Sequence, residues 1–402
     1  MSEKQLNILS IIGARPQFIK VAPICHLLKK TSHMHDGILV NHEILHTGQH
    51  YDYEMNKVFF DQMDIPAPDE NLEVGSGRHG AQTGIMLQKI ENRLIRERPD
   101  LAVVYGDTNS TMAGALAAAK LGISVAHIES GLRSFNRNMP EEINRLLTDH
   151  CSDFLFFPTD NACQNLKKEG VTNCVDQGRI IPLEKSATQE VFDFPVAVNI
   201  GDVMYDALQM ASHIAGATSN ILEELKIESK KYFLATLHRA ENTDDESCLR
   251  SILSAFQTIG DRMEVVFPIH PRTKKMIQNF DIDVTRMKSV RMIEPVGFFD
   301  MKILLKNSSK LLTDSGGMQK EAYFSRIPCL TLRDETEWIE TLENGNNVLT
   351  GADAQKIVEE AFKVHVFKAK TGKMTPFGDG KSAQRFLRFI VKYTEILCSR
   401  YT

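Results

Sequence analysis

The sequence has no apolar run long enough to cross a bilayer and no excess of basic residues. A transmembrane helix needs about 20 mostly apolar residues in succession, so we expect no membrane partner. Residues 1–5 lead directly into a strand pattern, without the apolar segment of a signal peptide. The net charge of −5 lacks the footprint of a nucleic-acid-binding protein, so no nucleic-acid partner is expected.

Closely spaced pairs of cysteines are absent from the sequence as well. The 402 residues contain seven scattered cysteines, an odd number, and no C-x-x-C pattern. Such a set is typical of reduced thiols and favours neither a disulfide framework nor a zinc site. We therefore predict a cytoplasmic protein.

Several enzyme signatures are missing. The sequence contains no H-E-x-x-H, G-x-S-x-G or G-x-x-x-x-G-K-[ST] pattern, which removes the motif evidence for a zincin, an α/β-hydrolase or a P-loop protein. The Gly-Lys-Ser at residues 380–382 does not follow a predicted strand. A G-x-G-x-x-G after the first strand is also missing, which argues against a bound dinucleotide.

The chain does contain a long alternation of strand and helix patterns. Its length favours two domains, and the alternation predicts parallel sheets with right-handed crossovers. The expected strands are residues 6–12, 38–45, 101–105, 124–128, 154–157, 232–236, 263–267, 290–293, 310–313 and 329–332. The predicted fold class is α/β, with two Rossmann-like domains whose sheets face each other across a cleft.

The expected domain boundaries follow breaks in this alternation. Residues 1–176 form an N-terminal domain with the acid and base residues, and residues 177–200 form a linker or insertion. Residues 201–379 form a C-terminal Rossmann-like domain. An amphipathic helix within residues 380–402 is expected to pack back toward the N-terminal domain.

Polar residues follow four expected strands of the first half. Arg15, His46, Asp107 and Glu129 each lie within three residues of a strand's end. Ligands of parallel α/β sheets bind outside the carboxyl ends of the strands. The four residues therefore predict one site, although single polar residues in loops are common.

Carboxylates and one histidine are the candidates for proton transfer. Asp107 and Glu129 can exchange protons with a substrate near neutral pH in a partly dry cleft. Glu141 either forms an exposed i,i+4 ion pair with Arg145 or faces the site from the first turn of a helix. His238 follows a strand and is suited to protonate or hydrogen-bond a leaving phosphate.

In the second half, a strand pattern ends in Thr-Asp-Ser and two glycines, where a helix pattern begins. Gly316 and Gly317 let the backbone approach a ligand closely, and the amides of the following helical turn suit a phosphate or diphosphate. Glu321, one turn further along, can accept hydrogen bonds from ribose hydroxyls. The alternative is a plain turn in which Asp314 or Ser315 caps the helix.

Six ordered motifs resemble those of the non-hydrolysing UDP-N-acetylglucosamine 2-epimerases. They read GARPQFIK at residues 13–20, HTGQH at 46–50, GDT at 106–108, HIESGLR at 127–133, PEEINR at 140–145 and DSGG at 314–317. The resemblance extends from about residue 7 to residue 385. It implies the GT-B fold, a homodimer, a UDP-binding C-terminal domain, and a reaction that needs no metal, nicotinamide or other cofactor.

The implied substrate is a UDP-2-acetamido sugar, and the implied reaction is an elimination followed by an addition. The C2 proton is removed and UDP leaves C1, which gives a 2-acetamidoglucal. UDP then adds back while a proton is delivered to the opposite face of C2. Such an enzyme would serve the synthesis of surface polysaccharides, including lipopolysaccharide.

Carried over motif by motif, the resemblance implies two groups of site residues and no metal ligand. The catalytic group is Asp107, Glu129, Glu141 and His238. The group that binds UDP and the sugar is Arg15, Lys20, His46, Gln49, His50, Arg145, His270, Ser315, Gly316, Gly317, Glu321 and Arg333.

Two stretches depart from the family pattern. Residues 336–340 read Thr-Glu-Trp-Ile-Glu where many members have Thr-Glu-Arg-Pro-Glu, and residues 73–79 replace a segment associated with an activating second UDP-sugar. The second departure argues against allosteric activation. Together they leave two candidate substrates, UDP-N-acetylglucosamine and UDP-2,3-diacetamido-2,3-dideoxyglucuronate. The latter would need a differently shaped wall near Trp338, unless Trp338 only packs there.

Three other functions remain open at this point. A hydrolysing epimerase would release free sugar and UDP, and a GT-B glycosyltransferase would move the sugar to an acceptor. A non-catalytic protein would only bind the nucleotide sugar. The carboxylates at Asp107, Glu129 and Glu141 favour chemistry over binding alone.

Overall fold

The computed structural model describes residues 4–30, 34–35, 37–49, 60, 63–181, 183, 194–285, 287–343, 345–364 and 376–394. The chain divides into two compact units, Met1–Met210 with Lys373–Thr402, and Ala211–Gly372. The division falls inside helix α7 (Val203–Thr218), and helix α15 (Ser382–Lys392) belongs to the first unit. The boundaries expected from the sequence were residues 176, 200 and 379.

The first unit is built on a largely parallel sheet. Within the described residues its strand order is β2-β3-β1-β5-β6-β7-β9-β8, with β4 beside β3, and only β2 pairs antiparallel. The strands are β1 (Lys4–Ile12), β2 (Met34–His35), β3 (Ile38–His46), β4 (Glu70–Asn71), β5 (Leu101–Tyr105), β6 (Ser124–Ile128), β7 (Phe154–Phe157), β8 (Cys174–Val175) and β9 (Val196–Asn199). Strand β9 therefore lies within the stretch expected to be a linker.

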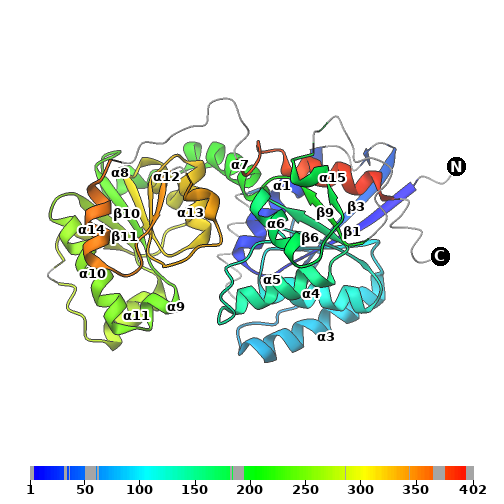
Figure 1. Ribbon diagram of the computed structural model, residues 1–402, viewed down its shortest axis with the longest axis horizontal. Helices are drawn as coiled ribbons and strands as arrows, with labels where there is room; N and C mark the ends of the chain where they lie inside the picture. Colours follow the sequence, from blue (N-terminus) through cyan, green and yellow to red (C-terminus); the bar gives the residue numbers. More distant parts are fainter. Residues whose placement is uncertain are drawn as a thin grey trace. The chain divides into compact units, whose positions relative to one another are not determined.

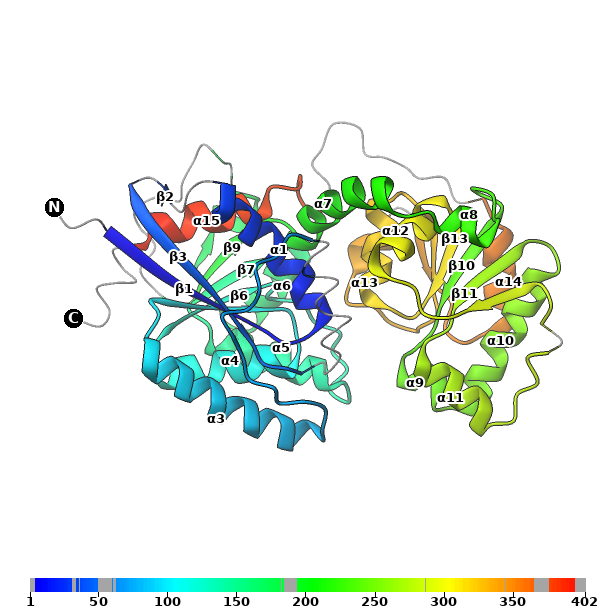
Figure 2. The ribbon, with the colours of Figure 1, turned by 180° about the vertical axis from the view of Figure 1, so that it is seen from behind.

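Helices cover both faces of this sheet, which is why β5 and β6 are buried along their whole length. Helices α3, α4 and α5 lie side by side on one face, and α1 packs with α15 on the other (Figures 1 and 2). The helices are α1 (Arg15–Lys30), α3 (His79–Glu97), α4 (Asn109–Lys120), α5 (Pro140–Cys151) and α6 (Asp160–Lys168). On α15, Phe386 and Phe389 pack against Phe156 of β7.

The second unit is a parallel sheet of order β12-β11-β10-β13-β14-β15. Its strands are β10 (Tyr232–Thr236), β11 (Glu264–Pro268), β12 (Val290–Ile293), β13 (Lys310–Thr313), β14 (Cys329–Thr331) and β15 (Asn347–Leu349). Counted along the chain from β10, this is the 3-2-1-4-5-6 order of a Rossmann sheet. The helices are α8 (Ile221–Leu225), α9 (Ala240–Thr243), α10 (Glu246–Gly260), α11 (Pro271–Asn279), α12 (Phe298–Asn307), α13 (Gly316–Phe324) and α14 (Ala354–Phe362).

Two apolar clusters, one on each face, stabilise the second sheet. One joins the sheet to α10 and α14 through residues such as Leu253 and Ile357, and the other joins it to α8 and α12 through Ile221 and Leu304. Apolar side chains therefore cover both faces of the sheet. Polar side chains lie in the turns at the ends of the strands.

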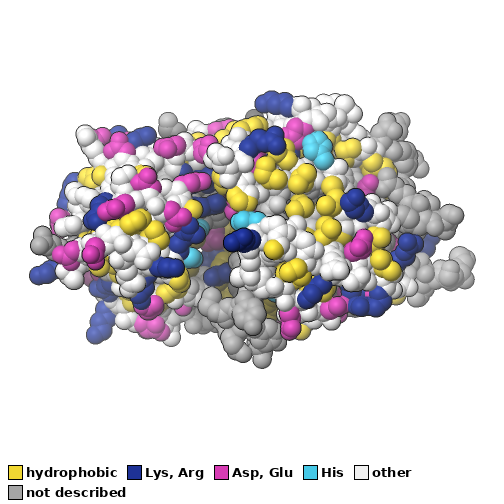
Figure 3. All heavy atoms as spheres, turned by 90° about the horizontal axis from the view of Figure 1, so that it is seen from below, with side chains coloured by type: hydrophobic (Ala, Val, Ile, Leu, Met, Phe, Trp, Pro, Cys, Tyr) yellow, Lys and Arg dark blue, Asp and Glu magenta, His cyan; other side chains and the backbone are white. Residues whose placement is uncertain are grey.

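The expected strands are confirmed, each to within two residues at either end. The short strands β2, β4, β8 and β15 were not foreseen. None of the described helices is long and apolar enough to cross a membrane. Acidic and basic side chains are interspersed on the face shown in Figure 3, without a continuous basic region among its described residues.

Candidate functional site

Gln17 of α1 holds the turns at the carboxyl edge of the first sheet. Its Oε1 accepts hydrogen bonds from the amides of Gly13 (2.8 Å) and Ala14 (3.0 Å), and its Nε2 donates to the carbonyl of Tyr105 (3.1 Å). Gly13 has no room for a side chain, because a Cβ would lie 2.0 Å from Thr47 Oγ1. The turns after β1, β3 and β5 therefore meet at one place, where parallel sheets bind ligands.

Asp107 follows β5 and pairs with Arg145 of α5. Nη2 of Arg145 lies 2.5 Å from Oδ2 of Asp107, and Nη1 lies 2.9 Å from Oε2 of Glu142. Asn144 also donates to the Asp107 carbonyl at 3.0 Å. Arg145 is buried, so the interpretation that placed Arg145 in an exposed ion pair with Glu141 is wrong. Helix α5 turns this face toward the Asp107 turn, which sequence spacing alone does not reveal.

Glu129 follows β6 and pairs with Lys20 of α1. The Nζ to Oε2 distance is 2.5 Å, and the two side chains are 7% and 10% exposed. Glu129 has φ of 75°, a left-handed conformation that residues with a Cβ adopt rarely. Gly106, also left-handed, makes room for the ammonium, because a Cβ there would lie 2.8 Å from Lys20 Nζ. Asp107 and Glu129 thus lie on neighbouring turns, each against a buried cation.

The buried side chain of His127 lies between the turn that carries Asp107 and the residues that hold the turn of Glu129. His127 of β6 lies with Nδ1 2.6 Å from Asp149 Oδ1 and Nε2 2.8 Å from the carbonyl oxygen of Gly106. Asp149 Oδ2 accepts from the amide of Gly131 at 3.1 Å and lies 2.7 Å from Nη2 of Arg133. Burial raises the pKa of Asp149, but His127 and Arg133 outweigh that effect and lower it below its usual value.

His46 and Gln49 hold the turn after β3. His46 is buried, with its ring stacked on Phe18 at 5.1 Å between centroids. Gln49 Oε1 accepts from the hydroxyl of Ser110 at 2.7 Å and so ties this turn to the start of α4. The contact with Ser110 places Gln49 close to the turn that carries Asp107, and the binding of substrate by His46 and Gln49 stays a prediction.

The remaining residues expected in this unit lie at helix starts. Arg15 is the first residue of α1, and Glu141 lies in the first turn of α5; both are half-buried. His50 lies outside the described residues.

Asp314, directly after β13, organises the candidate residues of the second unit. Its buried carboxylate accepts from the amides of His238 (3.0 Å) and Arg239 (2.8 Å) and lies 3.1 Å from Nδ1 of His238. Burial raises the pKa of Asp314, but its contacts with His238 and the Arg239 amide lower it overall. The contact turns Nε2 of His238 away from the carboxylate, and that side chain is 36% exposed.

His270 is brought next to His238, with ring centroids 5.5 Å apart. It is the N-cap of α11, where Nδ1 accepts from the amide of Arg272 at 3.2 Å. Burial and the charge of His238 lower the pKa of His270. The two rings come from the ends of neighbouring strands β10 and β11.

Helix α13 begins at the glycine pair. Ser315 is its N-cap, with Oγ accepting from the amide of Met318 at 3.4 Å. A Cβ on Gly316 would lie 2.2 Å from Oε1 of Glu337, whereas one on Gly317 would meet only the Ser315 hydroxyl, at 3.9 Å. The neighbours of Gly316 therefore leave no room for a side chain, whereas there is space beside Gly317.

Buried charges lie behind this helix start. Glu321 lies 3.1 Å from Nζ of Lys302, and Nη1 of Arg333 lies 3.1 Å from Oε2 of Glu337. The Nε and Nη2 atoms of Arg333 are buried and have no hydrogen-bond partner among the described residues. Arg333 thus keeps donors for a further acceptor, whereas Glu321 already has a cation.

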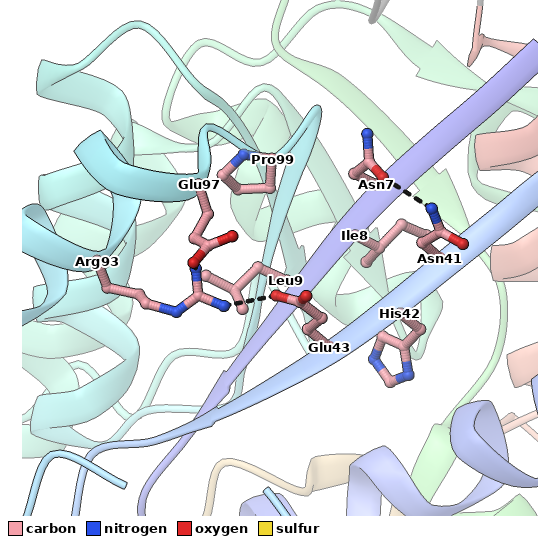
Figure 4. A pocket seen from close by; sticks show the side chains of 9 residues that line it. All are labelled: Asn7, Ile8, Leu9, Asn41, His42, Glu43, Arg93, Glu97 and Pro99. Carbon is pink, nitrogen blue, oxygen red and sulfur yellow. Dashed lines mark hydrogen bonds and ion pairs between the residues drawn. The ribbon is translucent and has the colours of Figure 1, made fainter. Parts of the chain in front are cut away.

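Figure 4 shows a cavity of about 360 Å³ beside the middle of β1 and β3 and the end of α3. It is lined by Asn7, Ile8, Leu9, Asn41, His42, Glu43, Arg93, Glu97 and Pro99. None of the expected site residues lines it, and Arg93 is already held by Glu43 at 2.5 Å and Glu97 at 3.2 Å. Over the part of the chain that the structure describes, no three His, Cys, Asp or Glu side chains are grouped to hold a metal ion.

Sequence reasoning missed the residues that hold the others in place. Gln17 and Asp314 lie inside the motifs GARPQFIK and DSGG, and Asp314 directly follows β13, so these positions were a usable signal. Asp149 had none, because it lies 22 residues from His127 in an ordinary helical pattern.

Residues 34–391 match the sequence profile of a family described as UDP-N-acetylglucosamine 2-epimerase. A UDP-N-acetylglucosamine 2-epimerase homolog of Methanococcus maripaludis is 46% identical, covering 98% of this chain and 99% of that protein. The UDP-2,3-diacetamido-2,3-dideoxy-D-glucuronate 2-epimerase of Pseudomonas aeruginosa is 43% identical, covering 96% and 100%.

Solved structures agree with these sequence matches. The crystal structure of Methanocaldococcus jannaschii UDP-GlcNAc 2-epimerase with UDP-GlcNAc and UDP has 41% sequence identity and a TM-score of 0.81, covering 96% of this chain and 100% of that one. The expected GT-B class, with two parallel-sheet α/β domains, is confirmed. This chain therefore belongs to the UDP-N-acetylglucosamine 2-epimerase family.

Proposed function

We propose that this chain inverts C2 of a UDP-2-acetamido sugar by a non-hydrolysing reaction. The observation that carries the proposal is the placement of Asp107 and Glu129 on neighbouring turns, each 2.5 Å from a buried cation. The 2-epimerase names of relatives that cover nearly the whole chain support it.

Inversion at C2 requires one group to remove a proton and another to return one to the opposite face. Asp107, Glu129 and Glu141 are the proposed acid and base residues, and Lys20 and Arg145 fix the positions of the first two. As the C2 proton leaves, its bonding electrons form a C1–C2 double bond. The C1–O bond breaks at the same time, and UDP departs with those electrons. Addition of UDP to the 2-acetamidoglucal, with protonation on the other face, gives the epimer.

The proposed UDP site lies in the second unit. Amides of Gly316 and Gly317 at the start of α13 suit the diphosphate, because a helix N-terminus carries unpaired N–H groups and a partial positive charge. Nε2 of His238, turned away from Asp314, would donate a hydrogen bond to a phosphate oxygen as UDP leaves. The buried donors of Arg333 suit another oxygen of the same ligand.

The other proposed contacts follow the family motifs. Arg15 and Lys20 would balance the charge of UDP. Glu321 would accept hydrogen bonds from the ribose while Lys302 holds it in place. Further contacts with UDP and the sugar are proposed for His46, Gln49, His50, Arg145, His270 and Ser315.

Two substrates remain in the proposal, and Trp338 does not decide between them. Its ring is buried, with Nζ of Lys320 3.8 Å from the ring centroid. That contact supports packing rather than a wall around the sugar. UDP-N-acetylglucosamine and UDP-2,3-diacetamido-2,3-dideoxyglucuronate should therefore be offered to the enzyme side by side, with kcat/KM compared for each.

Product analysis tests the proposed activity. We expect NMR spectra of the reaction to show the manno-configured UDP-sugar as the product, in equilibrium with the substrate. Free N-acetylmannosamine as the main product would identify a hydrolysing epimerase, in which water reaches the intermediate. Turnover that depends on an added acceptor would identify a glycosyltransferase, and UDP-sugar binding without turnover a non-catalytic protein.

We propose a homodimer, and Ile85 and Ile95 of α3, 45% and 56% exposed, are the apolar side chains that we would examine first in its interface. The proposed pathway is surface polysaccharide synthesis, including lipopolysaccharide. The proposed compartment is the cytoplasm, supported by free thiols at the six cysteines that the structure describes.

A further inference from the structure

Two cysteines outside the proposed site lie in contact. The sulfur atoms of Cys163 on α6 and Cys174 on β8 are 3.2 Å apart. The sulfurs of a disulfide are about 2.0 Å apart, so a shift of roughly 1 Å would join these two. Cys163 is 1% exposed, whereas Cys174, on the edge strand of the sheet, is half-buried. The pair is therefore prealigned, with one sulfur accessible from outside.

The contact also makes Cys163 the more acidic thiol of the two. A hydrogen bond from the thiol of Cys174 lowers the pKa of Cys163 to about 7, and the same contact raises the pKa of Cys174. Burial has the opposite effect elsewhere, because it raises the pKa of Cys25 and Cys329 to about 12. Since thiolates are the nucleophiles in disulfide exchange, only this pair is suited to react at neutral pH among these four cysteines.

We propose that Cys163 and Cys174 form a reversible disulfide by exchange with a small-molecule disulfide of the glutathione class. The Cys163 thiolate takes the proton of Cys174 across the 3.2 Å contact while the accessible Cys174 sulfur attacks one sulfur of the small disulfide and releases one thiolate. The released thiolate takes the proton from Cys163 and leaves as a thiol. The Cys163 thiolate then attacks the Cys174 sulfur of the mixed disulfide and releases the second thiolate, which takes up a proton from water. Two protein thiols are oxidised, and one small disulfide is reduced to two thiols.

The disulfide would act on a helix that supports Glu129. On α6, Asn165 donates to the carbonyl of Gly131 at 3.0 Å, and a Cβ on Gly131 would lie 2.6 Å from the Ala162 carbonyl oxygen. Drawing α6 toward β8 therefore strains the turn that carries Glu129. This consequence rests on the proposed function, and we expect the oxidised protein to lose turnover and to regain it with dithiothreitol.

Peptide mass spectrometry tests the disulfide without any activity assay. The full-length protein is incubated with oxidised glutathione at neutral pH, alkylated and digested with trypsin. Because Lys167 and Lys168 lie between the two cysteines, the disulfide appears as two linked peptides that separate on reduction. Cys174→Ser should abolish the link, and Cys151→Ser, in the same unit, should leave it at the wild-type level.

The outcomes separate the two parts of the inference. Alkylation of Cys163 and Cys174 without any linked peptide would overturn the disulfide. A linked peptide in a protein whose turnover is unchanged would overturn only the strain on the Glu129 turn. If the reduced protein has no epimerase activity, the proposed function fails, and the linked peptides still decide the disulfide.

Discussion

Nδ1 of His127 lies 2.6 Å from Oδ1 of Asp149, and this contact joins the two turns that carry the proposed acid and base residues. Nε2 of His127 faces the carbonyl of Gly106, and Oδ2 of Asp149 accepts from the amide of Gly131. The ring of His127 therefore bridges the Asp149 carboxylate and the Gly106 carbonyl. One buried pair therefore fixes the backbone next to Asp107 and Glu129.

The first prediction concerns this pair. Asp149→Asn removes the buried carboxylate that His127 and Arg133 share, and leaves Arg133 with Glu169 as its remaining carboxylate partner. We expect the free energy of unfolding to fall by about 3 kcal/mol, measured by urea denaturation. The control is Asp244→Asn, which breaks an exposed pair with Arg272 and should cost less than about 1 kcal/mol. Equal effects of the two substitutions would remove His127 and Asp149 from this role.

The proposed acid and base residues give a second prediction. Asp107→Asn and Glu129→Gln should each lower kcat by about 10²- to 10⁴-fold, because neither amide can exchange a proton at C2. UDP affinity, measured by calorimetry, should change little, since the proposed UDP site is built mostly from the second unit. Glu91→Gln on α3 is the matched control. Wild-type kcat in either site variant would take that residue out of the proton relay.

Helix α13 offers a pair of adjacent glycines for comparison. Gly316→Ala would place a Cβ 2.2 Å from Oε1 of Glu337, so that buried neighbours must move. We expect a loss of about 1–3 kcal/mol of unfolding free energy. Gly317→Ala meets only the Ser315 hydroxyl at 3.9 Å and should be nearly neutral for stability. The reverse order of the two losses in denaturant titrations would contradict the described packing.

We expect the carboxyl group of Asp206 to make the free energy of unfolding depend on pH. Burial raises the pKa of this carboxyl group from 3.8 to about 6 in the folded protein. Because the folded state binds the proton more tightly than the unfolded state, the stability from this group is complete below pH 3.8 and is lost as pH rises through about 6.

The matching measurement compares unfolding at several pH values. Asp206→Asn should flatten the dependence between about pH 4 and 6.5 and should raise stability at pH 7, where the wild-type carboxylate is charged and buried. A wild-type slope that persists in Asp206→Asn would assign the dependence to another group.

Much of the fold could be predicted because strands buried on both faces are continuous apolar runs. Residues 101–105 (LAVVY) are a clear example, whereas residues 124–128 (SVAHI) include Ser124 and His127. The polar residues after both strands were found by position alone. What failed were inferences about partners. The spacing of Glu141 and Arg145 suggested an exposed pair, but tertiary packing buries Arg145 against Asp107. Strand β9 has only four residues. It follows a stretch in which polar and apolar residues are mixed, so the sequence around it showed no regular pattern that would indicate a strand.

Incorporation of deuterium at C2 is the most direct test of the central claim that carboxylates of the first unit exchange the C2 proton. The enzyme is incubated with a UDP-2-acetamido sugar in deuterated water, and the C2 signal is followed by NMR. We predict that the epimer formed carries deuterium at C2, and that Glu129→Gln suppresses its appearance. An epimer that retains its original hydrogen at C2 would contradict this account.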